Sequence, residues 1–157
     1  MTWKLLNEEY NPDEDVLKEY VGFVYLITEL DTNKKYVGKK FFWSTRKLPP
    51  LKGAKRKRTV VKQSDWQDYY GSSEHLKEAI EQKGTEAYHR EILHLCKTKG
   101  ECSYLEAKEQ FDRDVLLRDD YYNAFIGCKI HAKHLPKSLQ PFIERPPTST
   151  WKRNTFP

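Results

Sequence analysis

The fold is decided by the stretch Gly22-Phe23-Val24-Tyr25-Leu26-Ile27, which is followed after a polar turn by Lys34-Lys35-Tyr36-Val37-Gly38-Lys39-Lys40. The first run is apolar and partly β-branched, Asp31-Thr32-Asn33 has the composition of a turn, and the second run resumes with Tyr and Val. This pattern predicts a β-hairpin. Pairing of the two strands brings Tyr25 and Tyr36 near each other, either as part of a functional site or as ordinary half-buried strand residues.

Positive charge is concentrated in one segment of the chain. Residues 32–64 contain twelve Lys or Arg and no Asp or Glu, whereas the whole chain has a formal charge of +5, so the remaining residues carry −7. A basic run of this kind neutralises phosphates and gives strong, salt-dependent binding to nucleic acid. A solvated charge run, or a localisation signal at Lys55-Arg56-Lys57-Arg58, is the alternative interpretation.

The length of 157 residues is that of one domain with a substantial core. We divide the chain into an acidic N-terminal extension or short helix (1–20), a main domain (21–130) with a basic insert at about 44–64, and a Pro-rich tail (131–157). No apolar run approaches a membrane span and no signal-peptide pattern is present, so we expect a cytoplasmic protein that does not contact membranes. Cys96, Cys102 and Cys128 lack the spacing of a zinc site, and we interpret them as small buried residues.

The rest of the main domain alternates helices and one strand. A capped amphipathic helix is predicted at residues 74–83, with Ser73 before it and Gly84 after it, a strand at 88–95 and the longest helix at 101–117. Residues 121–126 close the domain. The predicted fold class is α/β (α+β), with a small, mostly antiparallel three-stranded sheet flanked by helices. Trp66, beside the basic insert, is expected to anchor it to the core.

These residues resemble the GIY-YIG nucleases. The two family motifs look like Val24-Tyr25 and Tyr36-Val37-Gly38, a helical glutamate like Glu109, and a Tyr-Asn segment like Tyr122-Asn123. The resemblance covers about residues 22–126, and several shorter segments look like those of small stand-alone phage endonucleases, some of which are homing enzymes. If the protein is phage-encoded, its location is the host cell.

The resemblance implies a set of catalytic roles. Glu109 would hold one Mg²⁺ or Mn²⁺. A single carboxylate is sufficient for this, because Mg²⁺ often takes only one or two protein carboxylates. Tyr25 would act as the general base or relay to it, helped by Lys39 or Lys40, while Tyr36 orients the water. An arginine on the helix after the second motif would contact the phosphate, and both Arg46 and Arg58 are candidates. Asn123 would position the phosphate or support Glu109.

The predicted function is metal-dependent hydrolysis of DNA phosphodiester bonds by a monomer or a transient dimer. The nucleic-acid-binding residues are expected to be basic or to lie near the start of the helix at 74–83, and they are Lys39, Lys40, Lys55, Arg56, Lys57, Ser72 and His75. Two alternatives stay open. The domain could bind nucleic acid without catalysis, or its basic face could dock a structural component on an acidic protein.

Overall fold

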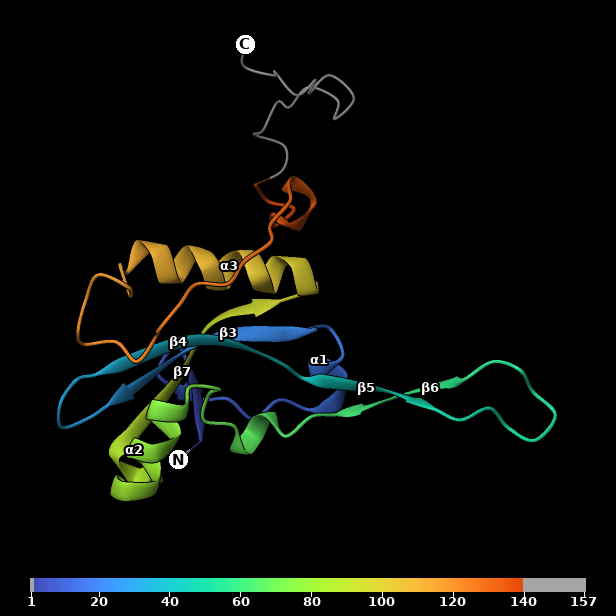
Figure 1. Ribbon diagram of the computed structural model, residues 1–157, viewed down its shortest axis with the longest axis horizontal. Coiled ribbons are helices and arrows are strands. Elements are labelled where there is room, and N and C mark those ends of the chain that lie inside the picture. Colours follow the sequence, from blue (N-terminus) through green and yellow to red (C-terminus); the bar gives the residue numbers. More distant parts are fainter. Residues whose placement is uncertain (1, 140–157) are drawn as a thin grey trace, which may run out of the picture.

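The computed structural model describes residues 2–139, and its centre is a mixed five-stranded sheet with the order β2-β1-β7-β3-β4 (Figure 1). A second sheet contains only β5 and β6. The strands are β1 (Trp3–Leu5), β2 (Glu8–Glu9), β3 (Gly22–Glu29), β4 (Lys35–Phe41), β5 (Trp43–Leu48), β6 (Arg58–Gln63) and β7 (Tyr88–Cys96). The helices are α1 (Glu14–Leu17), α2 (Glu74–Lys83) and α3 (Lys99–Asp112), with short 3-10 turns at η1 (Trp66–Asp68), η2 (Thr85–Ala87) and η3 (Ala132–His134).

The sheet is larger than the three strands predicted from the sequence. Its antiparallel centre, β7-β3-β4, agrees with the prediction, but β1 pairs in parallel with β7 and β2 pairs with β1. Leu6 and Asn7, both with positive φ, make the tight turn between β1 and β2. Trp3 is only 2% exposed, so part of the predicted N-terminal extension packs in the core.

Strand β3 is buried on both of its faces, which explains its continuous apolar sequence. Phe23, Tyr25 and Ile27 point into the cluster under α2 and η1, whereas Val24 and Leu26 point into the cluster under α3. Figure 1 shows α3 on one side of the sheet and α2 on the other. The hairpin with β4 has the register Tyr25↔Gly38 and Ile27↔Tyr36, so the two tyrosines share the α2 face.

Capping residues set the bounds of the two long helices. In α2 the Ser73 hydroxyl accepts a hydrogen bond from the Leu76 amide, and Gly84 ends the helix with φ +84°. Helix α3 begins after its N-cap, Thr98. It stops at Asp112, five residues before the predicted end, because Asp114 adopts φ 51°.

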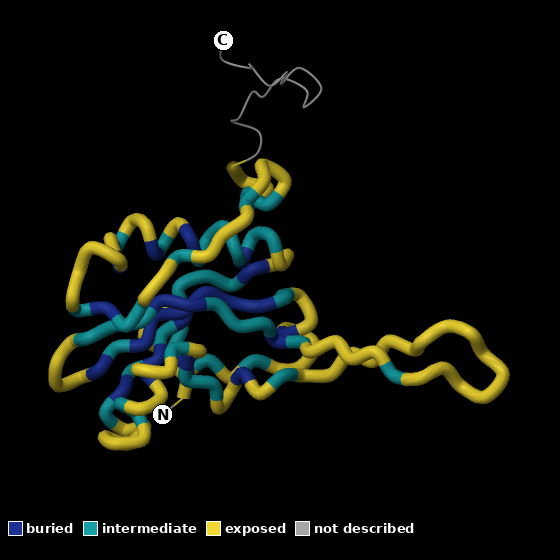
Figure 2. Tube along the Cα trace, in the orientation of Figure 1, coloured by how far each residue is buried: buried dark blue, intermediate teal, exposed yellow. Residues whose placement is uncertain are grey.

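The basic insert forms a long β-hairpin that leaves the body of the protein (Figure 1). We call β5, β6 and the connecting residues 49–57 the arm. Every residue of β6 and of 51–57 is exposed, and Figure 2 shows the arm almost entirely in the colour of exposed residues. The helix with an arginine that the resemblance implied after the second motif is therefore not found here. Trp66, at the foot of the arm, is 1% exposed and anchors it as expected.

The segment after α3 returns to the sheet beside β4, where Tyr121 bridges to Lys35. Cys96 and Cys102 are buried as predicted, but Cys128 is exposed. Residues 140–157, most of the predicted Pro-rich tail, lie outside the described residues. Among residues 2–139, no helix combines the length and apolarity needed to cross a bilayer.

Candidate active site

Two tyrosines meet on the α2 face of the β3-β4 hairpin. Their ring centroids are 6.2 Å apart, and Tyr69 packs edge-on against Tyr25 at 6.1 Å. Tyr25 is completely buried, whereas Tyr36 is half-buried and its hydroxyl lies 3.0 Å from the Ser72 hydroxyl. Tyr36 is therefore the tyrosine whose hydroxyl can reach a ligand.

Two glycines make room for these rings. A Cβ on Gly38 would lie 2.5 Å from the Tyr25 hydroxyl oxygen and 2.9 Å from the Tyr36 ring. Gly71 has φ +93°, and a Cβ there would lie 3.2 Å from the Tyr36 ring. The glycine of the Tyr-Val-Gly motif is thus required because a side chain would overlap the tyrosines.

A cavity of about 450 Å³ opens beside Tyr36, at the edge of the sheet formed by β4. Three segments meet there: the start of α2, the middle of α3 and the chain after Tyr121. The lining includes both nucleic-acid-binding candidates near α2, and its residues are Tyr36, Lys39, Ser72, Ser73, Glu74, His75, Glu106, Gln110, Tyr122, Asn123, Ala124, Phe125 and Gly127.

Two carboxylates, Glu106 and Glu74, line this cavity, whereas Glu109 does not. The Glu106 carboxylate lies 3.0 Å from the Lys39 ammonium, which also donates to the Ser103 hydroxyl at 3.0 Å. Both side chains of the pair remain partly accessible, with 17% of Glu106 and 28% of Lys39 exposed. Glu109, the expected metal ligand, therefore lies outside the cavity, and Glu106 is the carboxylate of α3 that lines it.

Glu109 lies on the flank of α3 that faces β7. Its carboxylate oxygens are 2.7 Å from His94 Nε2 and 3.0 Å from Arg113 Nε. Burial raises the pKa of Glu109, but the hydrogen bonds from His94 and Arg113 outweigh it and hold the pKa below its usual range. Both of its oxygens are engaged, so Glu109 braces α3 against the sheet.

The face of α3 that points to the site is polar, which is why an apolar stripe did not locate it. Ser103, Glu106 and Gln110 follow the i, i+3, i+7 spacing of one helix face. Gln110 is 6% exposed and donates to the Val37 carbonyl at 3.2 Å. Phe111, an apolar residue of the same helix, is 59% exposed. The polar spacing was the signal in the sequence that could have identified Glu106.

Asn123 contacts the backbone of the edge strand rather than Glu109. Its side-chain amide donates to the Val37 carbonyl at 2.8 Å and accepts from the Val37 amide at 3.0 Å. These two bonds fix the residues that follow Asn123 along one wall of the cavity. We therefore assign it a positioning role.

Neither candidate arginine reaches the cavity. Arg46 and Arg58 belong to β5 and β6, and Arg58 donates to the Pro49 carbonyl at the far end of the arm. Lys55, Arg56 and Lys57 are exposed at the tip. Sequence spacing could not show this, because an insert that extends away from the body carries both arginines with it.

Burial of the two tyrosines opposes their ionisation. Burial, followed by the neighbouring Tyr36 and Tyr69, raises the pKa of Tyr25 well above its usual value. Burial also raises the pKa of Tyr36, and the hydrogen bond with Ser72 offsets this only in part. The lysines expected to help pair elsewhere, Lys39 with Glu106 and Lys40 with Asp65 at 2.6 Å. Tyr25 packs against Tyr36, and its hydroxyl oxygen is buried.

A divalent metal would have the Glu106 carboxylate to bind here, since Glu74, the other carboxylate of the lining, pairs with Lys77 at 3.3 Å. Within residues 2–139 no cluster of three or more His, Cys, Asp or Glu side chains is present. Glu106 lines the cavity, and it lies beside the positive start of α2, where a phosphate is favourably placed. This donor set fits Mg²⁺ or Mn²⁺, which keep several waters and take one or two carboxylates together with substrate phosphate.

The fold and site define a nuclease domain of the GIY-YIG class, and comparison with protein families supports this. Residues 3–126 match the family model SegE_GIY-YIG, described as "Putative endonuclease segE, GIY-YIG domain". The match covers most of the chain, so the protein belongs to this family of endonuclease-type domains. Searches of curated proteins and of solved structures gave no match.

Proposed function

We propose that this protein is a metal-dependent endonuclease that cuts DNA at the cavity between Tyr36 and Glu106. The observation that carries this proposal is the convergence of a tyrosine, a lysine and a carboxylate on the edge of β4, in a chain of the GIY-YIG family. We also propose that one chain has one active site, so a monomer nicks one strand and a transient pair cuts both. A phage homing role predicts cleavage at few positions in a genome.

Each residue has a task that follows from its position. Phosphodiester hydrolysis builds negative charge on the attacked phosphate, and fixed positive groups stabilise it. Lys39 supplies a cation next to Glu106, and α2 directs the positive end of its dipole at the same cavity. The Tyr36 hydroxyl, held by Ser72, is placed to orient a water by hydrogen bonding.

Glu106 would hold Mg²⁺ or Mn²⁺. When bound, such an ion polarises the phosphoryl oxygen and favours ionisation of a bound water. His75 lines the same cavity and could donate a hydrogen bond to a phosphate oxygen or to the leaving oxygen. The burial of Tyr25, which raises its pKa, and its ring contact with Tyr36 favour a role in holding the Tyr36 ring over a role in proton transfer.

The test is nicking of supercoiled plasmid by wild type, Glu106→Gln and Glu109→Gln, with Mg²⁺ or with EDTA. Loss of one metal-ligand carboxylate is expected to lower the rate by at least about 100-fold. Glu109→Gln, three residues along the same helix, is expected to stay within about tenfold of wild type because its carboxylate binds only His94 and Arg113.

Several outcomes would contradict the proposal. If Glu109→Gln is inactive and Glu106→Gln is active, the site has been placed on the wrong side of α3. If wild type binds DNA but cuts neither duplex nor single strands with any divalent metal, the domain is a binding module. Metal-independent cutting would remove the role given to Glu106.

A further inference from the structure

The arm has two faces that differ in charge. Residues paired across β5 and β6 share a face, and Arg46 pairs with Val60 while Leu48 pairs with Arg58. The face with even numbers carries Ser44, Arg46, Leu48, Arg58, Val60 and Lys62. The face with odd numbers carries Trp43, Thr45, Lys47, Thr59, Val61 and Gln63. Three cations therefore lie on one face, and one on the other.

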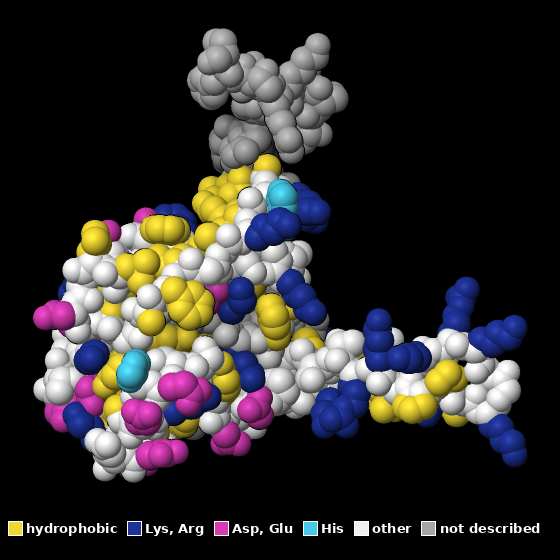
Figure 3. Space-filling view, in the orientation of Figure 1, with side chains coloured by type: hydrophobic (Ala, Val, Ile, Leu, Met, Phe, Trp, Pro, Cys, Tyr) yellow, Lys and Arg dark blue, Asp and Glu magenta, His cyan; other side chains and the backbone are white. Residues whose placement is uncertain are grey.

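The shape of the arm suits a groove of duplex DNA. Two six-residue strands give a ribbon about 20 Å long at about 3.4 Å per residue. A two-stranded ribbon with its side chains fits the major groove, about 12 Å wide, but not the minor groove, about 6 Å wide. Figure 3 shows Lys and Arg side chains along the arm, and no magenta acidic side chains on it.

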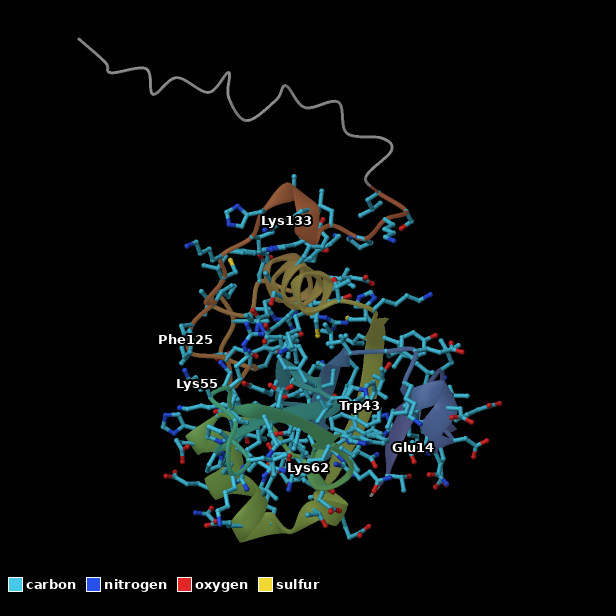
Figure 4. All side chains as sticks on the ribbon, turned by 90° about the vertical axis from the view of Figure 1, so that its right-hand side faces the viewer. Glu14, Trp43, Lys55, Lys62, Phe125 and Lys133 are labelled. Carbon is cyan, nitrogen blue, oxygen red and sulfur yellow. The ribbon has the colours of Figure 1, made fainter. Side chains whose placement is uncertain are left out.

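The basic face continues towards the active site. A groove of about 780 Å³ at the foot of the arm is lined by Arg46, Lys62, Lys40 and Lys39, among others. Lys39 also lines the active-site cavity and contacts Glu106. In the end-on view of Figure 4, Lys55 near the tip and Phe125 beside the cavity lie on the same side of the molecule. Because Lys39 lines both the groove and the cavity, one duplex can contact the foot of the arm and the cavity together.

We propose that the arm reads duplex DNA in the major groove, with its basic face towards the bases, within about one helical turn of the phosphate that is cut. Arg46 and Arg58 are the base-reading residues, because arginine binds guanine O6 and N7 through two hydrogen bonds. Lys62 and the tip residues Lys55, Arg56 and Lys57 neutralise phosphates and set the register. This inference rests on the proposed function, because it names how that nuclease selects its substrate.

The test measures binding apart from cutting. The full chain carrying Glu106→Gln is used to select duplexes from a pool of 40-bp DNAs with random centres. Two further proteins in the same background carry three changes each: Arg46→Ala, Arg58→Ala and Lys62→Ala on the basic face, or Thr45→Ala, Thr59→Ala and Val61→Ala on the other. Melting temperatures show whether each variant folds.

We expect the basic-face variant to bind DNA at least 30-fold more weakly than the Glu106→Gln protein. Each well-placed contact contributes about tenfold in affinity, and the remaining contacts of the arm offset part of the loss. Its plot of log affinity against log salt should be flatter by about 1, since about 0.9 is lost per phosphate contact and Lys62 is the one phosphate-binding residue among the three. The other variant should stay within about threefold. Guanine N7 methylation of the selected duplexes should block binding, whereas adenine N3 methylation in the minor groove should not.

Equal losses from the two variants would overturn the inference, as would interference from adenine N3 alone or equally tight, equally arm-dependent binding to single strands. The proposed function can fail separately. If wild type never nicks DNA but the basic-face variant loses binding and guanine preference, the arm inference stands and catalysis does not. If wild type cuts and both variants bind alike, the reverse holds.

Discussion

Strand β3 and strand β6 lie in one chain but obey different constraints. Seven of the eight β3 residues are buried, whereas all six β6 residues are exposed. The side chains of β3 pack alternately into two core clusters, so Tyr25 is fixed by its neighbours. In β6 only the register and the charge define the surface. Catalytic geometry therefore depends on packing in the body, and substrate selection depends on charge placement in the arm.

Equivalent truncations in the two strands test most directly whether β3 contributes more to stability than β6. Ile27→Ala in β3 removes a side chain that is 1% exposed, and about 2–5 kcal/mol of unfolding free energy should be lost. Val61→Ala in β6 removes one that is 59% exposed, and the change should be below about 0.5 kcal/mol. Urea unfolding measures both. Similar losses would mean that the arm packs against the body.

The buried end of β3 also predicts a dependence of stability on acid. Burial raises the pKa of Glu29, but hydrogen bonds from Lys83, Thr32 and Tyr88 outweigh it and lower the pKa to about 2. A lowered carboxyl pKa stabilises the folded state above pH 4.5, and this contribution disappears as the pH falls towards 2. Its size is on the order of 3 kcal/mol.

Urea midpoints between pH 7 and pH 2.5 would show this loss, and Glu29→Gln should flatten the curve across that window. A wild-type stability that does not change between pH 4.5 and 2.5 would contradict the contribution assigned to Glu29. The arm cannot supply this effect, because β5, β6 and residues 49–57 contain no Asp or Glu.

The smallest expected changes in stability come from substitutions at two glycines, one in the body and one in the arm. Gly38→Ala places a methyl group against the buried Tyr25 hydroxyl, and this overpacking should lower the free energy of unfolding by about 1–3 kcal/mol. The same change should remove much of the nicking activity. Gly53→Ala in the arm meets no atom within 4 Å, and its cost of about 1 kcal/mol comes from φ +89° alone. The second change should lower the melting temperature by at most about 4 °C. Melting curves and plasmid nicking together separate the two.

Local sequence signals located the elements whose structure is local. The apolar run of β3, the turn before β4 and the caps of α2 were readable because each depends on neighbours in the chain. Strand β1 was missed because three residues pair in parallel with β7, about 87 residues away, and no local pattern encodes that pairing. The strands of the arm were hidden because the charge of this segment indicated a nucleic-acid-binding insert but gave no strand pattern.

The candidate site was predictable in composition but not in geometry. Tyr36, Lys39, Ser72 and His75 line the cavity as the sequence suggested, whereas Glu109 does not. A rotation of one helix by about 60° exchanges Glu109 for Glu106, and hydrogen bonds of Gln110 to the edge strand set that rotation. Polar contacts of this kind have no hydrophobic periodicity to reveal them.

The two hydrogen bonds between Asn123 and the Val37 backbone also bear on aggregation at high protein concentration. Strand β4 is the edge of the sheet, and an edge with free amide and carbonyl groups is a template for pairing with another chain. Asn123 occupies both backbone groups of Val37, as a neighbouring strand would. The residue that shapes the wall of the cavity therefore also guards the protein against aggregation through the edge on which its active site is built.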